Sequence, residues 1–259
     1  CSSLKILSEL LEKHHENKVI LLIDEYDAPL AKAFERGYYD RMELFIRNLF
    51  EYALKTNDSL KFAVLTGCMG ISRESIFTGL NNLKVLSVTE VQFDECFGFT
   101  DCEVMEIMEY YGLSRHYQEM KDWYDGYEFG NMKVYCPWDV LNYCNTLLAD
   151  PDAKPGNYWI NMSSNEVVNR FMQQSDTKAT RREIEKLIAG GTITKEIHQE
   201  LTYKEMYSSV ENIWSVLYAT GYLTKKGKPD GDVLSLAIPN MEIRNNFTAE
   251  MPGEITTAI

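Results

Sequence analysis

The chain opens with apolar residues at helical spacing and then switches to a short, unbroken apolar run. Leucines three and four positions apart predict a helix over residues 3–15, because that spacing places them on one face. Residues 19–23 are all Val, Ile or Leu, which is typical of a strand buried on both faces of a sheet. A second apolar stripe predicts a helix over 39–55, and the runs at 62–66 and 85–88 predict two more strands. This alternation indicates a parallel sheet with helical crossovers.

Beyond about residue 100 the pattern is mostly helical. Apolar residues at helical spacing predict helices over 101–111, 114–124, 138–148, 166–173, 181–189 and 211–220. A loop is predicted at 150–156, where prolines and a glycine interrupt the pattern. Two short runs, 222–224 and 233–238, flank a turn with proline and glycine and predict a hairpin. Helices followed by such a hairpin resemble a winged-helix arrangement, and a helical lid with one hairpin fits the same pattern.

Composition and charge narrow the function classes. The 259 residues are 45% apolar and 25% charged, as in ordinary globular proteins. The longest aliphatic run falls far short of the ~18 residues of a membrane span, so no membrane contact is expected. With 26 basic and 39 acidic side chains the net charge is −13, which disfavours direct nucleic-acid binding by this chain. The six cysteines lack Cys-x-x-Cys spacing and predict free thiols in the cytoplasm.

The most informative segment is the point where the run 19–23 stops. Asp24, Glu25 and Asp27 follow it directly, so carboxylates replace apolar residues at the end of a predicted buried strand. Ligands gather at the carboxyl ends of parallel strands. In P-loop ATPases the first carboxylate there holds the Mg²⁺ of the nucleotide, and the next polarises the attacking water. The competing interpretation is an acidic turn in which Asp27 caps a following helix.

The next predicted strand ends in Thr66 and Gly67. In the same ATPase architecture a polar residue at this point senses the γ-phosphate or positions water. A threonine alone is also at home in any strand, because its β-branched side chain suits extended backbone. Thr66 alone therefore does not indicate a nucleotide site, and its assignment depends on the neighbouring residues.

Several blocks of sequence, taken together and in order, resemble the predicted AAA-ATPase-like family of bacteria. They are Leu21–Leu30, Leu65–Gly67, Ser75–Leu83, Trp123–Phe129, Val134–Asn142, Thr220–Thr224 and Ile238–Arg244. The resemblance implies a P-loop NTPase core and a helical lid, with ATP and Mg²⁺ as ligands. In many members a restriction-endonuclease-like nuclease domain follows the ATPase. Carried over by position, it implies that Asp24 is the Walker B magnesium ligand, Glu25 the catalytic base and Thr66 the sensor. Arg73 is the nearest cation and is assigned as a phosphate contact.

The chain also departs from this family. The family's phosphate loop precedes the Walker B strand, but residues 1–18 contain no glycine. The segment most similar to a phosphate loop runs from Gly221 to Gly227, but it has five residues between the glycines instead of four. It also has Pro229 where a Ser or Thr hydroxyl should reach Mg²⁺, so the segment is assigned to the hairpin. Because that loop supplies most of the triphosphate grip, we expect a fragment that starts after it and is inactive alone. The nuclease is not recognised in this chain either.

These observations predict an α/β fold: an incomplete P-loop NTPase core at 1–95, a helical lid at 96–150 and a winged-helix-like region at 151–259. In the intact protein, Mg²⁺ and ATP binding and hydrolysis would drive or regulate a partner, either a nuclease domain or another protein. The main alternative is a protein-binding switch derived from an NTPase, with vestigial hydrolysis. A nucleic-acid-binding winged helix is a third interpretation, which the charge disfavours.

Overall fold

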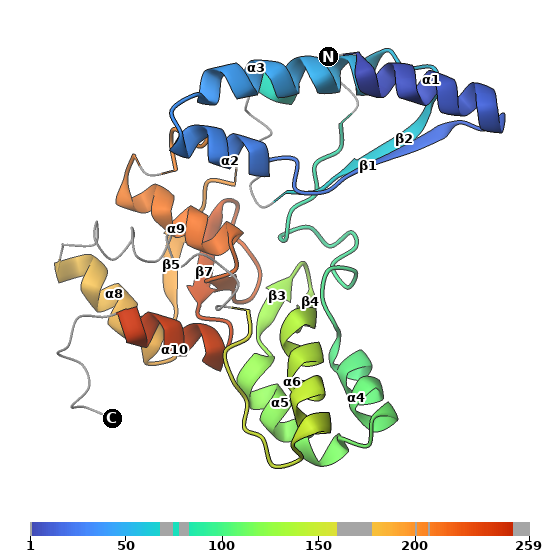
Figure 1. Ribbon diagram of the computed structural model, residues 1–259. Helices are drawn as coiled ribbons and strands as arrows, with labels where there is room; N and C mark the ends of the chain where they lie inside the picture. The colour runs from blue at the N-terminus through green and yellow to red at the C-terminus, as the bar shows by residue number, and fades with distance from the viewer. Residues whose placement is uncertain are drawn as a thin grey trace. The chain divides into compact units, whose positions relative to one another are not determined.

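The computed structural model describes most of the chain, as the coloured parts of Figure 1 show. The described residues are 2–67, 75–77, 83–159, 178–199, 201–206 and 208–250. The chain divides into two compact units. The first comprises Cys1–Val85 with the later segment His198–Asn212, and the second comprises Leu86–Ile197 with Ile213–Ile259.

The first unit is built on one parallel strand pair. Helix α1 (Ser3–His15) ends at Glu16 and leads into strand β1 (Val19–Ile23), as the sequence pattern predicts. Strand β1 pairs with β2 (Leu60–Leu65) in parallel, with Ile23 opposite Leu65. The carboxyl ends of the two strands therefore lie at the same edge.

The crossover between these strands is helical. It contains α2 (Ala28–Glu35) and α3 (Tyr39–Phe50), and α3 continues as a single π-helical segment, η1 (Glu51–Lys55). The predicted helix over 39–55 is thus confirmed, with a change of winding in its last turn. The short 3₁₀ segment η3 (Ser75–Phe77) lies against α3, where the rings of Phe50 and Phe77 stack 6.1 Å apart. Both rings belong to the buried core of the first unit.

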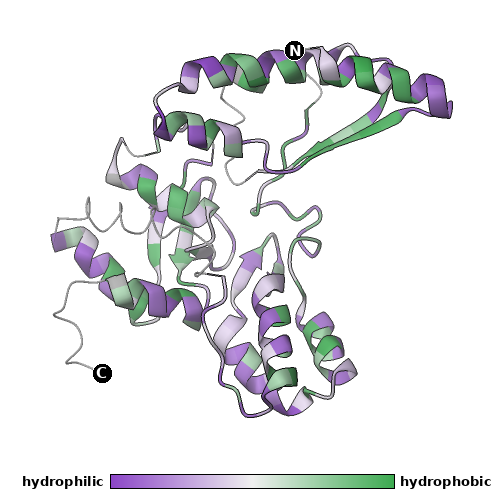
Figure 2. Cartoon of the chain, viewed as in Figure 1, coloured by the Kyte–Doolittle hydropathy of each residue, from purple (hydrophilic) through white to green (hydrophobic). Residues whose placement is uncertain are grey.

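Two predictions about this sheet are wrong. Strand β1 is not buried on both faces: β1 and β2 are almost uniformly apolar (Figure 2), yet one face, formed by Ile20, Leu22, Phe62 and Val64, is exposed. No described element covers that face, and Leu22 is 72% exposed. Residues 85–88 form no strand, since no described strand pairs with them.

The second unit begins with a helical cluster. A capping box formed by Thr100 and Glu103 starts helix α4 (Asp101–Tyr110). A 3₁₀ turn, η4 (Ser114–His116), leads into α5 (Tyr117–Tyr124), and α6 (Pro137–Ala149) begins with a proline in its first turn. These helices agree with the predicted ones. Their shared core consists of fully buried apolar and aromatic side chains, among them Val104, Met108, Met120, Tyr124, Val140 and Tyr143.

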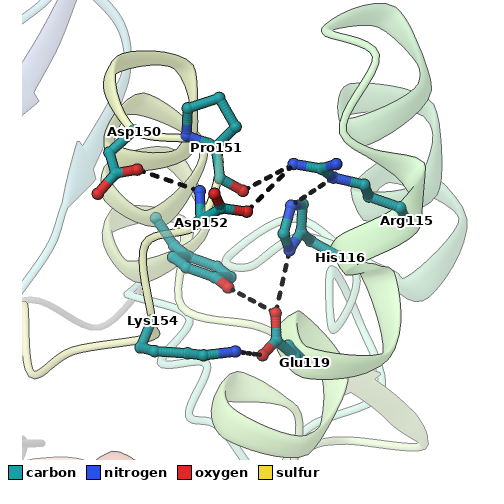
Figure 3. A network of polar contacts seen from close by, with 8 residues as sticks. Arg115, His116, Glu119, Asp150, Pro151, Asp152 and Lys154 are labelled. Atoms are coloured by element: carbon teal, nitrogen blue, oxygen red, sulfur yellow. Dashed lines mark hydrogen bonds and ion pairs between the residues drawn. The ribbon is translucent and has the colours of Figure 1, made fainter.

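A polar network fixes the loop after α6 against α5 (Figure 3). Arg115 donates to the carbonyl of Pro151 at 2.8 Å and to the ring of His116. The carboxylate of Glu119 meets His116 at 3.0 Å and Lys154 at 2.9 Å. These hydrogen bonds lower the pKa of Glu119 to about 2, so the network keeps a charged carboxylate at its centre. The loop predicted at 150–156 is therefore ordered by ion pairs rather than by secondary structure.

The rest of the second unit combines two small antiparallel sheets with helices. The first sheet is the hairpin of β3 (Tyr127–Phe129) and β4 (Met132–Val134). The second has the order β5-β7-β6. Its strands and the neighbouring helices are β5 (Ile193–Glu196), β6 (Thr224–Lys225), β7 (Val233–Ala237), α8 (Lys178–Ile188), α9 (Val210–Ala219) and α10 (Met241–Glu250). The predicted hairpin is confirmed as β6 and β7. Strand β5 and the β3–β4 hairpin were not predicted from the sequence. The helix predicted at 166–173 lies outside the described residues.

Two further expectations concern chemistry and membranes. The four cysteines that the structure describes, Cys96, Cys102, Cys136 and Cys144, are all free, as their spacing predicts. None of the described helices combines the length and the apolar character that a membrane crossing requires.

Candidate functional site

Two predicted site residues meet at the carboxyl ends of β1 and β2. Asp24 follows β1 and Thr66 follows β2, and the Thr66 hydroxyl donates to Asp24 Oδ1. The backbone continues the parallel pairing past the strands: Thr66 N–H donates to the carbonyl of Ile23 at 2.9 Å, and Tyr26 N–H donates to that of Thr66 at 2.9 Å. Because backbone hydrogen bonds lie on both sides of the contact, the two side chains are held together by the sheet itself.

Glu25 turns the chain sharply beside this contact. Its backbone has a φ of +50°, a left-handed conformation that non-glycine residues seldom adopt. This turn directs the Glu25 N–H inward, where it lies 3.1 Å from Asp24 Oδ1 and 3.4 Å from Thr66 Oγ1. The Glu25 side chain is exposed and makes no hydrogen bond to any described residue. Its carboxylate is therefore free to act on a ligand or a water molecule.

The donor set at the strand ends suits a magnesium ion that a nucleotide shares. Asp24 is exposed, and within the described part of the chain its Oδ2 has no hydrogen bond, so one carboxylate oxygen is open to solvent. No group of three or more His, Cys, Asp or Glu side chains in that part could hold a metal. Mg²⁺ does not need such a group, because it commonly binds through one or two carboxylates, waters and substrate phosphates. The residues therefore fit Mg²⁺ only together with a phosphate ligand.

Asp27 supports the turn from inside. It is the residue before α2, but its side chain makes no capping hydrogen bond to that helix. Instead it is buried, and Oδ2 lies 3.3 Å from the hydroxyl of Tyr203. A Cβ atom at Gly67 would come within 2.8 Å of Asp27 Oδ1 and 2.7 Å of the Tyr26 ring. Glycine after Thr66 is thus required by the close approach of the two strand ends.

Sequence reasoning missed Tyr203. Its ring lies against Phe34 and Tyr39, with ring centroids 6.3 and 6.1 Å away, and its hydroxyl reaches Asp27. The residue lies 176 positions after Asp27, and no local pattern connects the two. The remaining predicted site residue, Arg73, lies outside the described residues, so its role as a phosphate contact stays a prediction.

Comparisons with known proteins agree with the first part of the resemblance inferred from the motifs. Residues 1–77 match the family model described as Predicted AAA-ATPase. A protein of Azotobacter chroococcum mcd 1, described as an uncharacterized protein in the vnfD 5′ region, is 33% identical over 139 residues. The aligned part covers 51% of this chain and 26% of that relative, so the chain spans about a quarter of the relative's length. No solved structure matches the chain significantly.

Proposed function

We propose that the ends of β1 and β2 form the hydrolytic half of a Mg²⁺-ATP site in the intact protein. The observation that carries this proposal is the contact of Asp24 with Thr66 at the carboxyl ends of neighbouring parallel strands, with Glu25 beside it. Ligands of open parallel sheets bind at that edge. The match of residues 1–77 to a predicted ATPase family supports the same assignment.

Each residue has a role that follows from its position. Asp24 would hold Mg²⁺ through its open oxygen, and Thr66 would keep that carboxylate in one orientation through its hydroxyl. The ion, when bound, neutralises charge on the phosphate oxygens. Glu25 would accept a proton from the water that attacks the γ-phosphate, since its exposed carboxylate has no competing partner among the described residues. Tyr203 and Asp27 position this turn and touch no reacting atom.

The other parts of the family resemblance extend this proposal. A glycine-rich loop of the intact protein would bind the triphosphate, and Arg73 would add a phosphate contact. ATP turnover would drive or regulate a partner, either a nuclease domain or another protein. The division into a core, a lid and a winged-helix-like region belongs to the same proposal.

The experiment is ATP turnover by the intact gene product with Glu25→Gln, measured beside ATP affinity. Loss of the general base should lower turnover by about 10²- to 10⁴-fold, while ATP affinity stays within a few-fold of the wild type. Glu16→Gln is the matched control, because Glu16 is also an exposed glutamate with a left-handed backbone, at φ +55°. We expect the control to turn over ATP like the wild type.

Two results would contradict the proposal. Equal turnover in Glu25→Gln and wild type would remove Glu25 from the chemistry. A wild-type protein that binds ATP but never hydrolyses it, with an unchanged biological output in Glu25→Gln, would favour the alternative of a switch with vestigial hydrolysis.

A further inference from the structure

The second unit contains a cavity lined by lysines. Its volume is about 430 Å³, and it lies where the β3–β4 hairpin meets β6 and the turn that follows β6. Lys133 of β4, Lys225 of β6 and Lys228 of the turn all line it, and among the described residues of the lining only Glu128 of β3 is acidic. In a chain with a net charge of −13, this concentration of ammonium groups around one cavity needs an explanation.

Lys225 is the central observation. The residue is only 4% exposed, although lysine is almost never fully buried without a partner. Its Nζ donates to the carbonyl of Gly130, which also lines the cavity. No carboxylate of the described chain lies within ion-pair distance of Lys225. The buried ammonium, which has three donors, therefore makes one hydrogen bond, and the Glu128 carboxylate acts on it only from beyond ion-pair distance.

Glu128 is not the ion-pair partner of Lys225, because both oxygens of its carboxylate already have other partners. Oε1 lies 3.1 Å from Lys226 Nζ, and Oε2 accepts from the backbone N–H of Gly227 at 3.1 Å. Lys226 also donates to the carbonyl of Gly126 at 3.1 Å. Glu128 is thus paired with a fourth lysine, Lys226, whereas Lys133, Lys225 and Lys228 form no ion pair with any described residue.

Lys133 and Lys228 are exposed at the mouth of the cavity. Within the described ranges neither forms an ion pair or a side-chain hydrogen bond. Both ammonium groups are therefore available to a ligand, and the low-dielectric walls of a cavity strengthen their combined field. Lysine binds phosphate as a compact point charge, with several donors that need no fixed geometry.

We propose that this cavity, the lysine pocket formed by Lys133, Lys225 and Lys228 around Gly130, binds the phosphate groups of a small organic phosphate. The bound anion would pair directly with the buried Lys225, which no carboxylate of the described residues does. The volume lies in the range of small-molecule sites, roughly 300 to 1,000 Å³. The phosphate of a nucleic-acid backbone is the other source of the same chemistry, but the net charge of the chain opposes it.

The test is calorimetric titration of the protein with pyrophosphate in the absence of magnesium, so that no metal-dependent site contributes. Lys133→Gln combined with Lys228→Gln changes only exposed residues and should weaken binding at least about tenfold, the loss typical of removed charge-assisted hydrogen bonds. Lys225→Met should abolish binding. Lys186→Gln is the control, because Lys186 is an exposed lysine of the same unit outside the pocket.

A parallel titration with a single-stranded oligonucleotide identifies the source of the phosphate. Pyrophosphate binding that depends on the lysines supports a small phosphate ligand. Oligonucleotide binding that depends on them, with no pyrophosphate binding, overturns the small ligand in favour of a nucleic-acid backbone. Absence of both, or binding that is equal in the double variant and in Lys186→Gln, overturns the pocket. If Lys225→Met fails to fold, the exposed double variant decides alone.

Discussion

At the scale of single residues, the backbone of Glu25 adopts a left-handed conformation at the proposed site. Glu16 and Glu25 both have left-handed backbone conformations. Glu16 ends α1, and its N–H donates to the carbonyl of Glu12 at 2.8 Å, so the end of a helix explains its conformation. Glu25 ends a strand, where no such rule applies. Strained non-glycine residues cluster at sites where the strain serves the chemistry.

This strain predicts an opposition between stability and activity at position 25. Glu25→Gly should be more stable than Glu25→Ala by about 1 kcal/mol, because glycine adopts a positive φ without a steric cost. Both variants should lose ATP turnover in the intact protein. Urea unfolding of the two variants at equal protein concentration measures the difference. If Glu25→Ala proves as stable as Glu25→Gly, the left-handed turn is not a source of strain.

At the scale of elements, the sequence predicts the presence of a helix or strand more reliably than the burial of its faces. The bounds of α1 and β1 follow from spacing and from the abrupt change at Asp24, both of which are local signals. The burial of β1 is not local. An unbroken apolar run shows that a strand could be buried on both faces, but burial depends on other elements, and Leu22 is exposed.

The candidate site divides in the same way. Asp24, Glu25 and Thr66 could be predicted because each follows an apolar run, and parallel pairing brings the ends of such runs together. Tyr203 could not be predicted, since its contact with Asp27 depends on a segment that returns to the first unit late in the chain. A single tyrosine in a polar stretch carries no signal of such a long-range contact.

A buried acid pair between α6 and α10 gives a prediction at this scale. Asp139 of α6 and Glu242 of α10 are both buried, and the two carboxyl groups are close enough to interact. Burial and the neighbouring Glu242 raise the pKa of Asp139 to about 8. The folded state therefore keeps a proton that the unfolded chain releases near pH 4. The resulting stability is full below that pH and is lost as the pH rises through about 8.

Asp139→Asn tests this linkage, because an amide cannot ionise. Unfolding free energies measured between pH 4 and 8 should fall with rising pH in the wild type and less steeply in the variant. Asp152→Asn, at an exposed position of the same unit, should keep the wild-type slope. Equal slopes in all three proteins would show that the pair does not share a proton.

At the scale of the whole molecule, the two units carry different chemistry. The first presents exposed carboxylates at the strand ends, which suit a cation, and the second presents the lysine pocket, which suits an anion. The family match covers only residues 1–77, so the second unit is understood from its own contacts. The lysine pocket can be tested without magnesium and the strand ends only with it.

The central claim is that Asp24 holds the magnesium ion of a bound nucleotide. It is tested most directly by ATP binding to the intact gene product with and without Mg²⁺, measured by calorimetry for wild type, Asp24→Asn and the exposed control Asp58→Asn. We expect Mg²⁺ to tighten ATP binding in the wild type and the control, and Asp24→Asn to lose at least about tenfold of that effect. An equal effect of Mg²⁺ in all three proteins would contradict the claim.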